Sequence, residues 1–365
     1  MTYIKDLPHM KKTFNGSIKK FNSSIKKFSG ESHSEIPEGW NELTMANPWL
    51  NSIVLNASKY SDKVFTLITH PGYCCCEYRQ SLNIFTFGRL KMHIPFVVIG
   101  LPVSVDECGF TGNLNTLIED YKRRKGLFLV LNMHGNVNKE NIAGDVSFGK
   151  TLSTAIFDNH FKTYDEYLAA LRSPYRRRIR TASLKSTGLI WKEIDQAVFD
   201  EKLHTLYLNV LNKSKYPLEK LSLDFFRTID GQIHVLYENQ KPISEELDQK
   251  FNSTDQELEP LAFILVKWKK ETLHFLFGGM NYDKRDEHDL YYNMLLKILK
   301  IGISGNASKI DFGQTAESSK CRIGCRLEDR NMIFFSGNKI INRIAGLFFR
   351  FLEYKQPHEN YNIYR

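Results

Sequence analysis

The sequence predicts an α/β protein (α+β in its finer arrangement) with two domains. One observation is a strand–helix–strand pattern over residues 273–313, and a second is a similar order of elements over residues 95–132. The third is a length of 365 residues with 42% hydrophobic and 13% aromatic content, which is too long for one ordinary core and can fill two. We therefore expect two mixed, twisted sheets, each flanked by helices.

The segment 273–313 is the clearest unit of this kind. Its first five residues suit a largely buried strand, and Gly278 and Gly279 end that strand. Apolar residues then recur at helical spacing over residues 288–303, and Gly302 and Gly305 predict the end of this helix. The return strand begins at residue 309 and places Asp311 near its carboxyl end, where open α/β sheets usually bind ligands.

Most of the positive charge lies in residues 1–30. Seven lysines and one acid give this leader +6, which leaves +3 of the total +9 for the rest of the chain. The leader contains the repeat Ser-Ile-Lys-Lys-Phe, and its apolar residues recur every three or four positions. We expect a basic amphipathic helix over residues 10–28, either against an anionic membrane or partner or docked on the protein itself. Residues 30–39, rich in Ser, Glu and Pro, predict a linker.

The first predicted domain covers residues 40–150. Apolar runs broken by Gly and Pro predict strands at residues 64–69, 73–78, 82–87, 95–101 and 126–132, a helix at 114–124 and a polar connector at 135–150. The loop 100–112 matches no phosphate-binding fingerprint, and its Asp106 and Glu107 repel anions. We expect a structured connection there, with a substrate-contacting loop as the alternative.

The second predicted domain covers residues 151–365. It begins with an apolar helix face at residues 164–171 and a break at Pro174, followed by Arg176, Arg177, Arg178 and Arg180. Guanidinium groups bind phosphates and carboxylates through paired hydrogen bonds, so this run is the strongest anion-binding candidate, and a solvated helix face is the alternative. Further elements are expected as a helix at 199–212, a short helix or loop at 221–228, strands at 233–237, 261–267 and 273–277, and an exposed acidic loop at 244–260.

Neither a membrane span nor a metal site is expected. No apolar run approaches the roughly 20 residues that cross a bilayer, and the first residues lack the apolar stretch of a signal peptide. We expect a cytoplasmic protein, with peripheral contact at the inner membrane face through residues 10–28. Cys321 and Cys325 have no second Cys or His pair at zinc-site spacing, so we expect free thiols.

Several of these features together resemble a known family. The arginine run, the segment FLFGGMNYD, the helix closing with Gly302, and Asp311-Phe-Gly-Gln followed by Lys320 resemble the FemABX-like and BioF-like acetyltransferase domains of the GNAT superfamily. The resemblance covers residues 161–324, and the first domain resembles the partner half of such proteins in its order of elements. It implies tandem GNAT-like domains after a leader and linker at residues 1–39, and transfer of an acyl or aminoacyl group to an amine.

This chemistry requires a group that holds an anionic donor, a base for the amine and polarisation of the carbonyl. For donor or substrate binding we expect six basic residues, namely Arg176, Arg177, Arg178, Arg180, Lys320 and Arg322. Lys320 matches the family's lysine. For the catalytic base or the orienting group we expect Asp311 or Asp283, with His288 as a lesser candidate.

The donor is either an acyl-coenzyme A or an aminoacyl-tRNA. GNAT enzymes hold the coenzyme A pyrophosphate at the start of the helix after this strand, but here residues 282–289 carry four acids. Coenzyme A is therefore not supported at this place and aminoacyl-tRNA stays a rival donor, whereas the nearly neutral body of the chain stands against tRNA. The acceptor is expected to be an amine on a small molecule, a peptide or a cell-wall precursor. A noncatalytic protein that binds a membrane or nucleic acid through its leader is the alternative.

Overall fold

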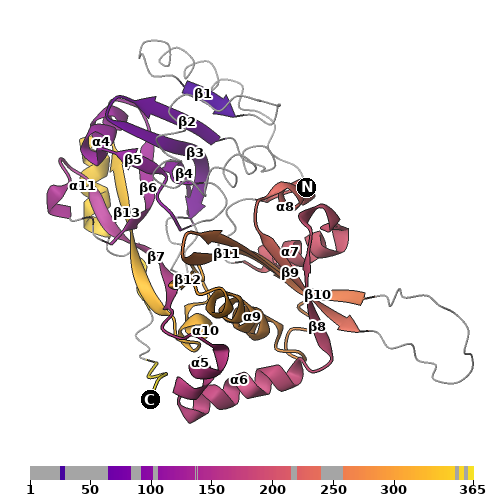
Figure 1. The fold of residues 1–365 in the computed structure, drawn as a ribbon. Helices are drawn as coiled ribbons and strands as arrows, with labels where there is room; N and C mark the ends of the chain where they lie inside the picture. The colour runs from indigo at the N-terminus through magenta and orange to yellow at the C-terminus, as the bar shows by residue number, and fades with distance from the viewer. Residues whose placement is uncertain are drawn as a thin grey trace, which may run out of the picture.

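The protein is built on one mixed sheet that runs through the whole molecule (Figure 1). The structure is a computed structural model and describes residues 25–28, 65–83, 92–101, 106–135, 137, 139–214, 220–239, 258–349, 353–356 and 361–365. Its sheet has 13 strands in the order β1-β2-β3-β4-β6-β13-β7-β12-β11-β10-β9-β8, and β5 pairs with β3 beside this path. Helices flank the sheet, so the predicted α/β class is confirmed.

The strands span β1 Ile25–Phe28, β2 Phe65–His70, β3 Tyr73–Asn83, β4 His93–Ile99, β5 Phe110–Gly112, β6 Leu127–His134, β7 Ser147–Asp158, β8 Leu189–Ile194, β9 Gln232–Asn239, β10 Leu258–Lys269, β11 Thr272–Met280, β12 Lys309–Asp311 and β13 Arg326–Ser336. The α-helices span α4 Leu114–Lys122, α5 Tyr164–Ala170, α6 Ser173–Lys185, α7 Glu201–Lys213, α8 Leu223–Thr228, α9 Leu290–Ser304, α10 Glu317–Cys321 and α11 Lys339–Phe348. No helix in these parts of the chain is long and apolar enough to cross a membrane.

Two strand–helix–strand units repeat the same geometry. In the first, β4 and β6 are parallel neighbours, and the connection between them contains α4. In the second, β11 and β12 are parallel neighbours joined through α9. Each parallel pair is only three residues long. The repeated order of elements predicted from the sequence is therefore present.

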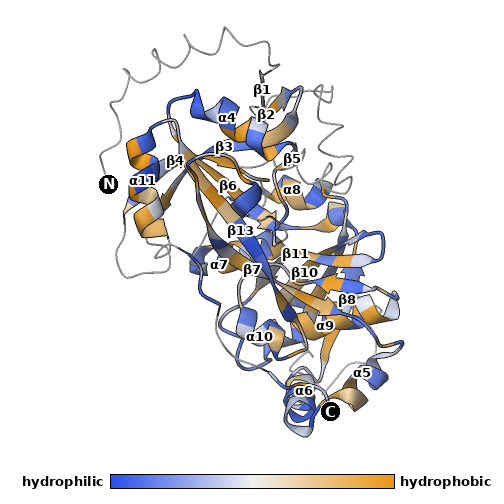
Figure 2. Cartoon of the chain, turned by 90° about the vertical axis from the view of Figure 1, so that its left-hand side faces the viewer, coloured by the Kyte–Doolittle hydropathy of each residue, from blue (hydrophilic) through white to orange (hydrophobic). Residues whose placement is uncertain are grey.

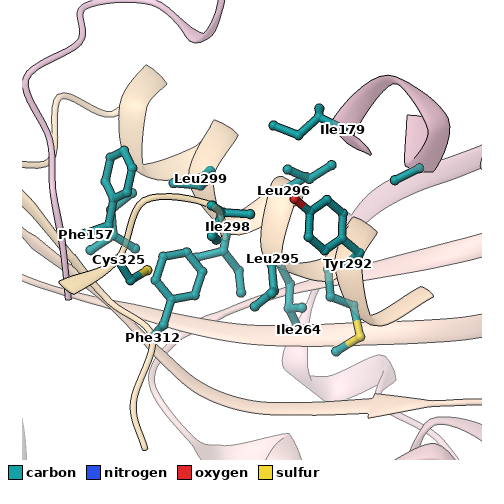
Figure 3. Close-up of a cluster of buried hydrophobic side chains, with 14 of the residues drawn as sticks. Phe157, Ile179, Ile264, Tyr292, Leu295, Leu296, Ile298, Leu299, Phe312 and Cys325 are labelled. Atoms are coloured by element: carbon teal, nitrogen blue, oxygen red, sulfur yellow. The ribbon is translucent and has the colours of Figure 1, made fainter. Parts of the chain in front are cut away.

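Helix α9 of the second unit is largely buried. Its apolar residues face a buried cluster that also receives Phe157 from β7, Ile264 from β10 and Phe312, the residue that follows β12 (Figure 3). Gly302 allows the helix to lie close to β12, because a Cβ at that position would come within 2.3 Å of Ile310 Cδ1. The predicted strand–helix–strand unit thus holds its elements together by close packing.

The two predicted domains share one sheet and part of one core. Strand β13, near the end of the chain, pairs with β6 on one side and with β7 on the other. One hydrophobic cluster contains Cys74 and Val98 together with Phe225 and Phe263. The predicted boundary at residue 150 falls inside β7, and the predicted polar connector 135–150 ends as part of that strand. The division of the chain into two domains at residue 150 stays a prediction.

The structure corrects the predicted leader helix at its end. Residues 25–28 form the edge strand β1, which pairs antiparallel with β2 from Ile25 opposite Ile68 to Phe28 opposite Phe65. The free edge of β2 supplies backbone partners that an isolated amphipathic helix lacks, and tertiary pairing overrides the helical spacing. Residues 10–24, the linker 30–39, residues 84–87 and residues 244–257 lie outside the described part of the chain.

Candidate functional site

The parallel strands β11 and β12 separate after a short contact. They pair at Thr272–Lys309, Leu273–Ile310 and His274–Asp311, and β12 ends there while β11 continues to Met280. Strand β10 remains paired with β11 on its other edge. Residues 275–278 of β11 are only half-buried although they lie in the interior of a wide sheet. Beyond the pair His274–Asp311, no described strand pairs with the edge of β11 that faced β12.

Asp311 and His274 face each other at this last pair. Both side chains are 8% exposed, and His274 Nδ1 lies 3.4 Å from Asp311 Oδ2. The other carboxylate oxygen of Asp311 accepts a hydrogen bond of 2.7 Å from the backbone N–H of Gly313. That bond fixes the carboxylate next to the imidazole, which is the arrangement by which a carboxylate orients a histidine.

Lys320 lies beside this pair, on α10. Its ammonium donates hydrogen bonds to the carbonyl oxygens of Gly313 at 3.1 Å and Gln314 at 2.8 Å, and the residue is 2% exposed. Burial lowers the pKa of Lys320 to about 8, and the nearby acidic groups of Cys325, Asp311 and Asp106 offset part of that effect. The side chain expected to hold the donor thus holds the loop that follows β12.

That loop carries backbone strain. Thr315 and Ala316 have φ of 66° and 50°, which L-residues with a Cβ rarely adopt. Gln314 fastens the same loop to the first half of the sheet, because its amide donates to Asn132 Oδ1 at 3.0 Å and to the Leu152 carbonyl at 2.7 Å. Strain of this kind persists where surrounding contacts hold it, and it is frequent at functional sites.

Asp106 and Arg330 complete the buried group. Arg330 is 4% exposed, and its guanidinium lies 3.3 Å from Asp106 Oδ2 and donates to the Asp106 carbonyl oxygen at 3.2 Å. Burial and the charge of Asp311 raise the pKa of Asp106 to about 6, against the opposing effect of Arg330. We refer to His274, Asp311, Lys320, Asp106 and Arg330 as the junction cluster, because they come from both halves of the sheet.

Sequence reasoning found two members of the junction cluster and missed three. Asp311 was identified from its place at a strand end and Lys320 from the resemblance, whereas Asp106 was interpreted only as a residue that repels anions. His274 and Arg330 were not singled out. His274 is a polar residue between apolar residues of a buried strand, and that pattern is the signal that marks it. Arg330 lies in the polar run Glu-Asp-Arg-Asn at residues 328–331, which gives no such signal.

The arginine run is part of one continuous helix. Helix α5 ends at Ala170 and Pro174 lies in the first turn of α6, where proline is tolerated, so the predicted break before the arginines is confirmed. Arg178 holds Asp289 with both terminal nitrogens, Nη2 donating at 2.8 Å, and its guanidinium lies 4.1 Å from the centre of the Tyr292 ring. Of the others, Arg176 is half-buried, and Arg177 and Arg180 are exposed.

Tyr292 connects Arg178 with Arg322. Burial raises the pKa of Tyr292 to about 12, and the positive charges of Arg178 and Arg322 act in the opposite direction. Arg322 is exposed and lies 5.6 Å above the Tyr361 ring. The phenol oxygen of Tyr292 is buried without a hydrogen-bond partner within the described residues. Two of the predicted anion-binding arginines thus lie near one buried hydroxyl.

The side chains of the acidic loop 282–289, which precedes α9, form ion pairs and hydrogen bonds with nearby protein residues. His288 Nδ1 lies 3.1 Å from the Lys185 carbonyl oxygen, which can only accept, and its Nε2 lies 3.3 Å from Glu287 and 3.6 Å from Glu238. Lys284 pairs with Glu287 at 3.0 Å. The spacing of Glu238, Glu287 and His288 also allows a shared cation. Asp283 is exposed at the start of this loop.

The predicted residues therefore fall into two places. Asp311 and Lys320 belong to the junction cluster at the separation of β11 and β12. Arg178 and His288 belong to the contact between α6 and the start of α9, and Asp283 is exposed in the loop before α9. The structure does not bring Asp283 or His288 to Asp311 by any hydrogen bond or ion pair among the residues it describes. The catalytic roles of all these residues stay predictions.

Comparisons with known proteins reveal similar structures at low identity. No family model matches the sequence, and no curated protein matches it. Among solved structures, the chain is similar to the C-terminal domain of an Agrobacterium fabrum protein assigned as a lysylphosphatidylglycerol synthetase, with 9% identity over 82% of this chain and 93% of that one and a TM-score of 0.49. It is similar to L-PGS from Bacillus licheniformis, with 13% identity over 87% and 99% and a TM-score of 0.46. A third similar structure is FemX, with 12% identity over 81% and 93% and a TM-score of 0.43. At these values the likenesses assign no role to any residue here.

Proposed function

We propose that this chain is an acyltransferase of the GNAT type, which moves an acyl or aminoacyl group from an activated ester or thioester to an amine. The observation that carries the proposal is the separation of β11 and β12 at the buried pair of His274 and Asp311. An unpaired strand edge next to an oriented imidazole supplies a place for an extended donor and a base for an attacking amine.

The donor is proposed to lie along β11. Beyond His274, β12 no longer covers the edge of β11. The backbone N–H and C=O groups of that edge can pair with an extended, amide-bearing molecule in the way that they would pair with an added strand. The half-buried residues 275–278 are accessible for that contact. Arg178 and Arg322, which both lie near Tyr292, would hold the donor's phosphates. Acyl-coenzyme A and aminoacyl-tRNA both carry such phosphates, and both are retained as donor classes.

The proposed reaction uses His274 as the base and Asp311 as the residue that positions it. The acceptor nitrogen attacks the carbonyl carbon, so an N–C bond forms while the C–S or C–O bond to the donor breaks. His274 takes the proton that the nitrogen loses and returns it to the leaving thiolate or alkoxide. Proton transfer by a positioned side chain contributes about 10² to 10⁴-fold to such rates.

The test is incubation of the purified full-length chain with a labelled donor and an amine-rich extract, followed by identification of the labelled product. One set of reactions contains labelled acyl-coenzyme A, and a second contains labelled aminoacyl-tRNA. We expect one donor to give a labelled amide. The absence of labelled product from both donors, over a range of amines, would contradict the proposal and leave the noncatalytic binding alternative.

A further inference from the structure

Helix α11 presents an apolar stripe to solvent. Five of its side chains are large, hydrophobic and 36–70% exposed, namely Ile340, Ile341, Ile344, Leu347 and Phe348. The spacing of Ile340, Ile344, Leu347 and Phe348 places them on one face of the helix. Only four other large hydrophobic residues of the described chain are comparably exposed, and they are scattered over other elements. A gathered patch of this kind marks a binding surface.

The opposite face of α11 is anchored in the protein. Asn342 is 4% exposed, accepts a hydrogen bond of 2.7 Å from the backbone N–H of Ser336 and donates one of 2.9 Å to its carbonyl. Phe349, just beyond the helix, is 6% exposed and stacks on Phe334 of β13. The helix is therefore held in place by one side, and its apolar stripe lies on the side away from the described core.

Basic residues border the apolar stripe. Lys339 and Arg343 are exposed on α11, and Arg343 lies one turn from Ile340 and from Leu347. Residues 337–349 contain no acid. The backbone of Gly337 lies against the end of α4, where Arg123 and Lys125 are exposed, whereas Arg124 pairs with Glu77 and Asp120. Figures 1 and 2 show α4 and α11 at the same end of the molecule, with strongly apolar segments along α11.

We propose that α11 and the end of α4 dock on an anionic lipid bilayer, with the apolar stripe in the interface and the basic residues among the headgroups. A helix with large apolar side chains on one side and Lys or Arg beside them binds membranes by both effects. A second copy of the chain fits less well, because Lys339 and Arg343 of two such faces would be brought together. This inference does not depend on the proposed transfer reaction.

The test measures partition of the full-length chain onto vesicles of phosphatidylcholine with or without phosphatidylglycerol. We expect binding that requires phosphatidylglycerol and that falls at least about tenfold in the double variant Ile344→Gln/Leu347→Gln. The matched control is Leu184→Gln/Val198→Gln, which changes two side chains of similar exposure, 68% and 61%, on other elements. It should bind like the natural chain. Lys339→Gln and Arg343→Gln should each weaken binding by about fivefold.

Three outcomes would overturn the inference. Equal binding by the natural chain and Ile344→Gln/Leu347→Gln would assign membrane contact to another segment, such as residues 1–30. A dimer that dissociates in the same double variant would make the stripe a self-interface. The absence of binding to vesicles would exclude a lipid bilayer as the partner of α11. All substituted side chains are exposed, so thermal unfolding of each variant should match that of the natural chain and separate binding from folding.

Discussion

Lys320 illustrates how the fold shifts the chemistry of a single residue. Its ammonium is 2% exposed, and burial lowers its pKa from 10.5 to about 8. The unfolded chain therefore holds a proton on Lys320 more tightly than the folded one does. The folded state is penalised below pH 8 by roughly 3 kcal/mol, and the penalty disappears as pH rises to 10.5, where the unfolded lysine also loses its proton.

Replacement of Lys320 by Met should remove this pH dependence. The difference in unfolding free energy between the natural chain and Lys320→Met is expected to rise in favour of the natural chain between about pH 8 and 10.5. The size of that rise is roughly 3 kcal/mol. Urea denaturation of both chains across this range measures it, and the titrations of groups that do not interact with Lys320 cancel in the difference. A difference that stays constant with pH would show that burial does not depress the lysine's pKa.

At the scale of elements, the sequence predicted what local patterns encode. The helical spacing before Gly302 and the apolar run 273–277 lie within single segments, so α9 and the first part of β11 were predicted. The strand does not end at Gly278 and Gly279 as predicted, because both pair with β10 and β11 continues to Met280. Strands β7 and β13 were missed because each is defined by pairing with the other, more than a hundred residues away. Arg330 on β13 and its contact with Asp106 were missed for the same reason, because the two residues are far apart in the sequence. The site was predicted where one segment holds it and missed where two segments meet.

Two helical glycines should respond oppositely to alanine. In Gly302→Ala the new Cβ would lie 2.3 Å from Cδ1 and 2.6 Å from Cγ1 of buried Ile310, so we expect a loss of about 1–3 kcal/mol despite the better helix propensity of Ala. Gly346 of α11 has no atom closer than 3.9 Å to such a Cβ, so Gly346→Ala should stabilise by up to about 1 kcal/mol. Chemical denaturation of both variants checks this, and equal effects would contradict the close approach of α9 to β12.

At the scale of the whole molecule, buried charges join the two halves of the sheet. Arg330 on β13 contacts Asp106 in the loop after β4, and Asp106 is close enough to Asp311 on β12 for their charges to interact. Glu107 extends this junction, with Lys269 at 3.6 Å and His134 at 3.5 Å. Removing one partner of a buried pair leaves the other charge without compensation, which is more costly than removing both.

A double-mutant cycle tests this junction. Arg330→Met alone should lower the free energy of unfolding by about 3–5 kcal/mol, and Arg330→Met/Asp106→Leu should lower it by less. The control is Lys202→Met, which breaks a pair with Glu259 whose side chains are 55% and 43% exposed. It should cost at most about 1 kcal/mol. If the double variant loses as much as the sum of its single variants, the two residues do not act as a pair.

The central claim is that transfer occurs where β11 and β12 separate, with His274 as the base. The most direct test compares His274→Gln with His234→Gln, since both histidines lie on strands of the same sheet and both are 6% exposed. With the donor and amine found to react, His274→Gln should lower the rate by about 10² to 10⁴-fold while donor binding is retained, and His234→Gln should leave the rate nearly unchanged. Equal rates in the two variants would contradict a catalytic site at this separation.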